Sequence, residues 1–213
     1  MSIKTEQKQK LASEQDPNHI KQGIYLLLDT EASGIHPHKH GLLEVAAVVL
    51  DDGLNIVGQY QTYINPPEDV LIDPVAMELT GISQREIESG ISYQDFCSGF
   101  IQFVKENFDA KPIVVAQFYP FDAAYLNYVF EYCGYNKLLF DILGNDFVDT
   151  KSLVNQVNMR AKLNNQPIPY PITSLSKEGG LKDVLGIEGE QFRAHSAMGD
   201  VLATLEVLRA LMR

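Results

Sequence analysis

Apolar and alternating segments in the first third of the chain have the length and composition of β-strands. The first runs from Ile24 to Asp29 (IYLLLD), the second is LLEVAAVVL at 42–50, and the third lies within LNIVGQYQTYIN at 54–65. The Asp52–Gly53 step between the second and third segments is typical of a β-hairpin turn. The pattern therefore predicts an antiparallel three-stranded meander.

Helical spacing dominates the rest of the chain, interrupted by one short buried strand predicted at 112–116 (PIVVA). Apolar residues recur at the three-and-four spacing of a buried helical stripe over 93–108 and over 197–211. A further helix is predicted from Phe121 to Cys133, because Gly134 follows it as a stop signal. We expect an α/β fold, with a mixed sheet of about five strands, three antiparallel and then parallel, flanked by helices.

Length and composition fit one α/β domain. The 213 residues are 45% hydrophobic and contain no long Gly/Pro-rich linker, so residues 21–213 are expected to form a single domain with a substantial core. Residues 1–20 are expected to form a polar tail, since they lack the apolar region of a signal peptide. No apolar run approaches the roughly 18 residues that cross a bilayer, so no membrane association is expected. Cys97 and Cys133 are interpreted as reduced core thiols, which favours a cytoplasmic setting.

Four carboxylates and one histidine come from distant segments. Side chains alternate faces along a strand, so Asp29 and Glu31 project from the same face and can share one metal ion. Asp122 falls in the first turn of the helix predicted from residue 121. Asp200 lies in the last helix, and five helical steps would place His195 about 140° around it, so His195 is expected on the preceding loop. Two divalent ions roughly 3.5 to 4 Å apart neutralise the charge of phosphodiester hydrolysis, and carboxylates suit them as ligands.

The order of the motifs identifies a family resemblance. DTE, LLEVAAVVL, INP, MELTGIS, FDAAYL, DTKSL and HSAMGDVLAT follow one another between about Ile24 and Leu211, and this series resembles the DEDDh exonucleases of the ribonuclease H-like fold. The resemblance implies a 3′ to 5′ exonuclease. It also implies that two Mg²⁺ or Mn²⁺ ions are held by Asp29, Glu31, Asp122 and Asp200, with His195 as the general base.

Within that family the chain is most similar to the ribonuclease T group, which implies a possible homodimer and a pocket for the terminal bases. The positions that match this pocket are Ile35, Leu79 and Phe121, so two of the three are aliphatic. The segment before the second-motif aspartate reads AQFYPFD, whereas the family commonly has a His-Asn step there. The second motif is therefore expected to be shaped differently here, and base stacking is expected to be poorer, with an apolar wedge still able to pack on a base.

A net charge of −11 is unusual for a protein that binds a polyanion, because such binding draws on Lys and Arg. Six basic residues precede the last motif and form either a positive rim beside the site or a solvated surface: Lys151, Arg160, Lys162, Lys177, Lys182 and Arg193. Glu44 either faces the metals or is exposed at an edge. The HPHKH turn at 36–40 is interpreted as an exposed loop, with zinc binding or a substrate-edge role as alternatives.

The sequence thus predicts a metal-dependent exonuclease that releases 5′-mononucleotides from single-stranded 3′ ends. The substrate is expected to be RNA, such as tRNA or other structured RNA tails, or DNA, since no residue reports on contact with a 2′-hydroxyl. Two alternatives stay open. One is a proofreading-type DNA exonuclease that works as a polymerase subunit, and the other is a non-catalytic nucleic-acid-binding module.

Overall fold

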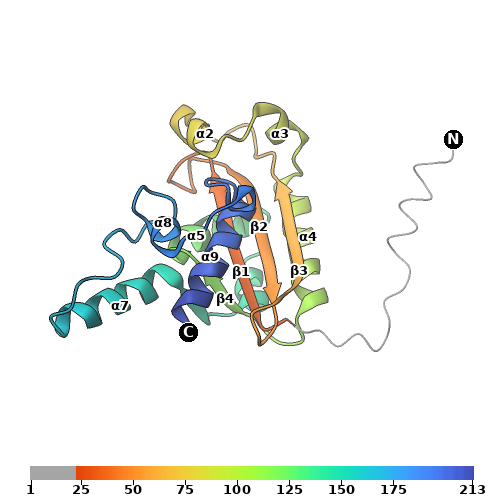
Figure 1. Ribbon diagram of the computed structural model, residues 1–213. Helices are drawn as coiled ribbons and strands as arrows, with labels where there is room; N and C mark the ends of the chain where they lie inside the picture. The colour runs from red at the N-terminus through yellow and green to blue at the C-terminus, as the bar shows by residue number, and fades with distance from the viewer. Residues whose placement is uncertain (1–22) are drawn as a thin grey trace.

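Five strands form one mixed sheet in the computed structural model, which describes residues 23–213 (Figure 1). The strands are β1 (Tyr25–Ala32), β2 (Leu42–Leu50), β3 (Ile56–Tyr63), β4 (Ile113–Ala116) and β5 (Phe147–Asp149). Their spatial order is β3-β2-β1-β4-β5. The β1–β2 and β2–β3 pairs are antiparallel, whereas β1–β4 and β4–β5 are parallel. The predicted mixed sheet is confirmed, while the expected tail at 1–20 lies outside the described residues.

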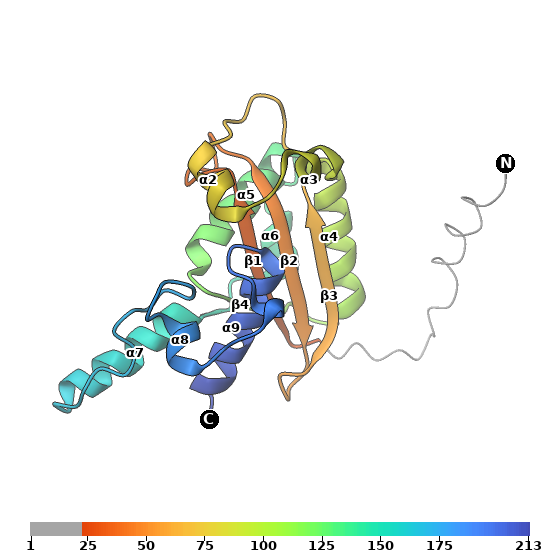
Figure 2. The same cartoon turned by 45° about the horizontal axis from the view of Figure 1, so that its top comes forward.

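Helices cover both faces of this sheet (Figure 2). They are α2 (Pro74–Thr80), α3 (Gln84–Ser89), α4 (Tyr93–Asn107), α5 (Tyr119–Tyr132), α6 (Leu138–Leu143), α7 (Thr150–Leu163), α8 (Leu181–Leu185) and α9 (Ala197–Leu211), with a 3₁₀ turn η1 (Glu190–Phe192) before α9. Helices α4, α5 and α6 pack on one face and α9 packs on the other. Every residue of β2 is buried as a consequence, which explains its continuous apolar run.

Alternation along β1 distributes its side chains between these two layers. Leu26 and Leu28 join the core beneath α4 and α5. Leu27 points the other way, into the core beneath α9. Odd-numbered positions of β1 therefore face α9, and even-numbered positions face α4 and α5.

Two element boundaries beside the acidic motifs differ from the sequence prediction by more than one residue. β1 continues to Ala32 rather than ending at Asp29, because its backbone pairs with β2 along the whole span. Helix α5 begins at Tyr119 rather than Phe121, and Pro120 is compatible with that first turn since proline needs no N–H partner there. The DTE segment is thus held inside the sheet, and Asp122 remains in the first turn of α5.

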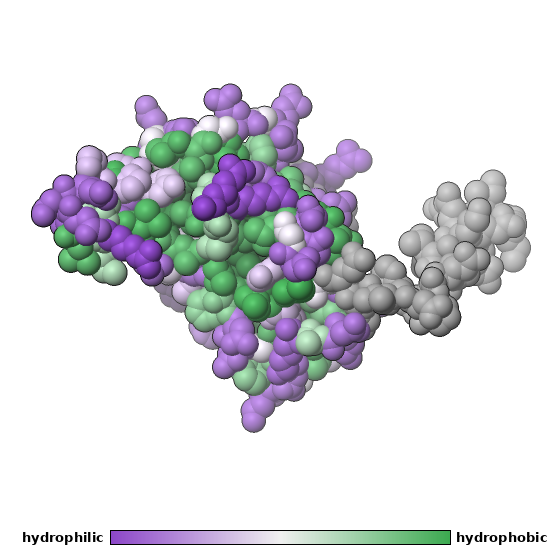
Figure 3. Space-filling view, turned by 60° about the horizontal axis from the view of Figure 1, so that its bottom comes forward, coloured by the Kyte–Doolittle hydropathy of each residue, from purple (hydrophilic) through white to green (hydrophobic). Residues whose placement is uncertain are grey.

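The face opposite α2 and α3 is a mosaic of hydrophobic and hydrophilic residues, with hydrophilic side chains along its periphery (Figure 3). Within residues 23–213, no helix combines the length and the apolar character that a membrane crossing demands.

Candidate active site

The site is built where β1 extends past its neighbour β4. The two strands pair only from Tyr25 opposite Ile113 to Leu27 opposite Val115. Asp29 and Glu31 therefore lie beyond the paired part of β4, on the face of β1 that α9 covers. Because β4 ends at this point, residues from the helices on the other face of the sheet can reach these acids.

Asp122 enters this space from the opposite face of the sheet. Only two residues separate the end of β4 from α5, so the first turn of α5 is held against the sheet edge. The hydroxyl of Thr30 donates a 2.8 Å hydrogen bond to Oδ1 of Asp122, whose side chain is buried. The middle residue of DTE thus holds Asp122, while its two neighbours face α9.

The third contribution comes from α9 and the loop before it. Asp200 accepts a 3.1 Å hydrogen bond from the backbone N–H of His195 and a 3.3 Å hydrogen bond from the Ser176 hydroxyl. His195 has a positive φ of 57° and lies outside the helix, as the spacing argument predicted. A side chain at Gly199 would collide with the Arg193 carbonyl, so glycine lets the His195 loop lie against α9. Ligand atoms of Glu31, His195 and Asp200 lie within 4.8 Å of one another.

Glu44 is buried rather than exposed, which settles the choice left open by the sequence. It lies opposite Glu31 on β2. Its carboxylate accepts a 3.1 Å hydrogen bond from the backbone N–H of Ala197 and a 2.7 Å bond from the Gln61 amide. Glu44 therefore fixes the start of α9 and adds a further negative charge to the same region.

Burial raises the pKa of every carboxyl group in the predicted metal set, and neighbouring acids raise it further at Asp29 and Glu31. Burial, followed by the charge of Asp122, raises the pKa of Asp29 well above its ordinary value. Burial, followed by the charge of Asp200, raises the pKa of Glu31 to about 8. Burial raises the pKa of Asp122 to about 7 despite the hydrogen bond from Thr30. Burial also raises the pKa of Asp200, against the lowering effect of the His195 N–H. Divalent cations would offset the negative charge of these buried carboxylates, and oxygen ligands of this kind suit Mg²⁺ and Mn²⁺.

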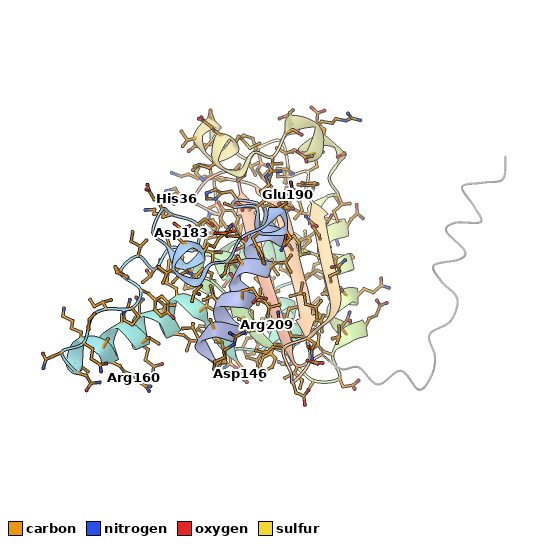
Figure 4. All side chains as sticks on the ribbon, viewed as in Figure 1. His36, Asp146, Arg160, Asp183, Glu190 and Arg209 are labelled. Atoms are coloured by element: carbon orange, nitrogen blue, oxygen red, sulfur yellow. The ribbon has the colours of Figure 1, made fainter. Side chains whose placement is uncertain are left out.

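An open cavity of about 350 Å³ adjoins these acids. Its lining includes Asp29, His195 and Asp200 together with Lys151 and Lys177. Two of the six basic residues singled out in the sequence thus line the cavity. Arg160, by contrast, lies on the protruding outer part of α7 (Figure 4). The lining also contains residues that the sequence analysis did not select: Gln117, Phe118, Thr173, Ser174, Leu175 and Ser176. Two of them, Gln117 and Phe118, belong to the segment AQFYPFD, where the sequence departs from the family pattern. Nothing in the sequence pointed to the other four.

The three predicted base-contacting residues, Ile35, Leu79 and Phe121, are not part of the lining of this cavity. The Tyr125 hydroxyl donates a 2.7 Å hydrogen bond to the Gly34 carbonyl, which precedes Ile35. Phe121 packs against Tyr125 with their ring centroids 5.1 Å apart. Ile35 and Leu79 are 73% and 59% exposed, so their apolar surfaces are available to a ligand.

Helix α2, which carries Leu79, is tied to the segment after β1 by the backbone bond from Asp73 N–H to the Ser33 carbonyl. The HPHKH segment follows, with the rings of His36 and His40 stacked 5.8 Å apart. Within residues 23–213, Glu31, His195 and Asp200 form the one group of ligand-bearing side chains close enough to share a metal ion. The structure gives the zinc alternative at 36–40 no support.

These features define a chain of the exonuclease class. The RNase_T family model, described as an exonuclease, matches residues 26–208, which covers all five residues of the predicted metal and base set. The chain therefore belongs to this exonuclease family, and the resemblance drawn from its motifs is confirmed.

The chain is similar to parts of several larger proteins. The DNA polymerase III PolC-type protein of Thermotoga petrophila is 27% identical over 193 residues, which is 88% of this chain and 12% of that protein. Human ERI1 exoribonuclease 2 is 28% identical over 96 residues, or 43% of this chain and 14% of that protein. Escherichia coli exonuclease I, solved with a dT13 oligonucleotide, has the same fold, with a TM-score of 0.70 and 24% identity over 90% of this chain and 41% of that chain. The chain thus spans a minor part of each of these relatives.

Proposed function

We propose that this chain is a 3′ to 5′ exonuclease that hydrolyses the terminal phosphodiester bond of single-stranded nucleic acid and releases 5′-mononucleotides. The observation that carries the proposal is the convergence of acids from β1, α5 and α9 at one sheet end, with His195 beside them. Four carboxylates whose pKa values are all raised are costly to keep together. Such a cluster is typical of a site whose chemistry requires bound cations.

The residues fit two divalent ions, which when bound would neutralise the charge that develops during hydrolysis and favour ionisation of water. Asp29, Glu31, Asp122 and Asp200 would hold them. His195, on its exposed loop, would accept the proton from the attacking water as a general base. The Asp200 carboxylate holds this loop in place through the backbone N–H of His195.

Ile35, Leu79 and Phe121 would receive the terminal nucleotide. Exposed aliphatic surfaces can pack against the face of any base, so this pocket would bind a 3′ end without base specificity. RNA is the substrate that we expect first, with DNA as the second, and both require a free single-stranded 3′ end.

One assay tests the proposal directly. Single-stranded RNA and DNA of equal sequence, labelled at the 5′ end, are incubated with the protein in Mg²⁺ and resolved by length. We expect a ladder that shortens from the 3′ end, and the substrate that shortens faster gives the sugar preference. Absence of any ladder in both Mg²⁺ and Mn²⁺ would refute the proposal and favour a non-catalytic binding module.

Replacing His195 by alanine should slow turnover about 10²- to 10⁴-fold, the usual contribution of a general base. Metal affinity should change little, because the four carboxylates remain. Turnover is measured under single-turnover conditions, and Mn²⁺ affinity by titration calorimetry. Unchanged turnover would exclude the role as base, whereas a large loss of Mn²⁺ affinity would make His195 a ligand instead.

The PolC-type relatives favour a second candidate, a proofreading DNA exonuclease that acts with a polymerase. Duplex DNA with a mismatched 3′ end would then be shortened faster than the matched duplex, and the chain would copurify with a polymerase. Equal rates on the two duplexes, together with faster digestion of RNA, would count against this candidate.

A further inference from the structure

Phe118 has a backbone conformation that a phenylalanine rarely adopts. It precedes α5 with φ 72° and ψ 52°, in the left-handed region, where its Cβ crowds the backbone. Glycine and asparagine tolerate this region far better. Residues that carry such strain cluster at functional sites, where the surrounding structure holds them in place.

Several contacts impose this conformation. The N–H of Phe118 donates a 3.2 Å hydrogen bond to the carboxylate of Asp149, at the end of β5. The Phe118 carbonyl accepts a 3.1 Å bond from the N–H of Phe121. The preceding Gln117 is fixed by the Thr150 hydroxyl and by a 3.0 Å bond from its amide to the Thr173 carbonyl. None of these contacts uses the aromatic ring, so the fold does not explain why the residue is phenylalanine.

The ring itself lies in the cavity beside the acids. Phe118 is 48% exposed and lines the same space as Asp29, His195 and Asp200. The ammonium of Lys151 lies 4.5 Å from the centroid of the ring, over one face. Lys177 also lines the cavity. An aromatic surface and two cations thus surround a space that opens directly onto the proposed scissile bond.

We propose that Phe118 stacks on a nucleobase and that Lys151 and Lys177 bind the backbone phosphate of the same nucleotide. This nucleotide adjoins the scissile phosphate on the side opposite the pocket of Ile35, Leu79 and Phe121, which do not line the cavity. Any base presents a face for stacking, so the contact tolerates all sequences. The inference rests on the proposed function, since it assigns the part of the strand that this cavity takes.

Replacing Phe118 by asparagine removes the ring and also relaxes the strained backbone. Substrate affinity and protein stability should therefore change in opposite directions. Phe118→Asn is expected to raise the melting temperature of the metal-free protein by about 2–4 °C. The same variant should raise the KM for a 5′-labelled single-stranded 12-mer, U12 RNA or dT12 DNA, whichever the wild-type protein shortens faster, about tenfold, as expected for loss of one stacked base, with kcat within about twofold. Lower affinity in a more stable protein cannot result from unfolding. Phe118→Tyr keeps the ring and should retain the wild-type KM.

A matched control exists elsewhere on the surface. Phe140 in α6 is 53% exposed and has the ammonium of Lys111 4.9 Å from its ring centroid, but it does not line the cavity. Phe140→Asn should leave the KM unchanged. Lys151→Met should raise the KM and lower the dependence of KM on salt, because one phosphate contact is lost.

Failure of this inference can be told apart from failure of the proposed function. If the wild-type protein shortens the oligonucleotide but Phe118→Asn has the same KM, the stacking role is wrong and the exonuclease proposal stands. The same conclusion follows if the variant is less stable and loses kcat rather than affinity. If the wild-type protein shortens neither DNA nor RNA, the exonuclease proposal itself is wrong.

Discussion

Asp200→Asn is expected to abolish digestion of single-stranded 3′ ends, with a loss of roughly a thousandfold or more in rate, since charge stabilisation by bound ions is worth several kcal/mol. The substitution preserves the size of the side chain. The two carboxylate oxygens of Asp200 accept one bond each, so the amide oxygen can keep the bond from the His195 N–H while the amide NH₂ can donate to the Ser176 hydroxyl. The loss would therefore come from the missing negative charge rather than from a displaced helix. The measurement is the single-turnover rate on 5′-labelled oligonucleotide in Mn²⁺.

Glu206→Gln is the matched control on the same helix. Its carboxylate pairs with Arg209 at 2.7 Å, and the residue is not part of the cavity lining. A surface ion pair of this kind contributes about 0–1 kcal/mol to stability, so activity should remain within about twofold of wild type. Digestion by Asp200→Asn at more than a tenth of the wild-type rate would remove Asp200 from the metal set.

The second large effect is a change in stability, because loss of a carboxylate is expected to make the metal-free protein more stable. Glu31→Gln should inactivate the protein yet stabilise its metal-free form at alkaline pH. The folded protein holds the Glu31 pKa at about 8, whereas an unfolded glutamate titrates near 4.5. Between these values the folded state binds more protons than the unfolded state, so the free energy of unfolding falls as pH rises through this window. Glutamine carries no charge and removes this penalty.

The pKa shift corresponds to about 1.4 kcal/mol for each pKa unit, so the melting temperature of Glu31→Gln without metal should exceed that of wild type by at least about 5 °C at pH 8.5. At pH 4.5 the two proteins should melt close together. Mn²⁺ should raise the wild-type melting temperature strongly at pH 8 and little at pH 5, because the ligands must lose their protons to bind it. A metal-free wild-type protein whose melting temperature stays level from pH 5 to pH 8.5 would contradict this account of the carboxylate cluster.

The sequence predicted the sheet and the separate parts of the site because both depend on local patterns. Alternation placed Asp29 and Glu31 on one face, and helical spacing placed His195 outside α9; the structure has both arrangements. The mixed order of strands followed from the meander and the later parallel strand. Metal binding by these residues stays a prediction, as do the boundaries of the domain.

Other parts of the site depend on contacts between distant segments, which no local pattern reports. Glu44 lies in an apolar run, and only its bond to the Ala197 N–H, 153 residues away, shows that it faces inward. In the sequence, Phe118 belongs to an unusual motif and has no evident role. Its left-handed backbone conformation is imposed by Asp149 of a neighbouring strand, a contact that no local pattern reports. The partner of Asp122 was also missed, because Thr30 faces away from the other acids of its strand.

The division of DTE between two layers has an evolutionary consequence. Asp29 and Glu31 face one side of the sheet, while Thr30 holds Asp122 on the other side. All three residues must therefore keep their places in the alternation of side chains along β1. Insertion or deletion of a single residue upstream in this strand would invert every side chain and direct the acids into the apolar layer under α4 and α5. Insertions and deletions in β1 should therefore be removed by selection. Sequence variation among descendants of this chain should accumulate in the loops that surround this strand.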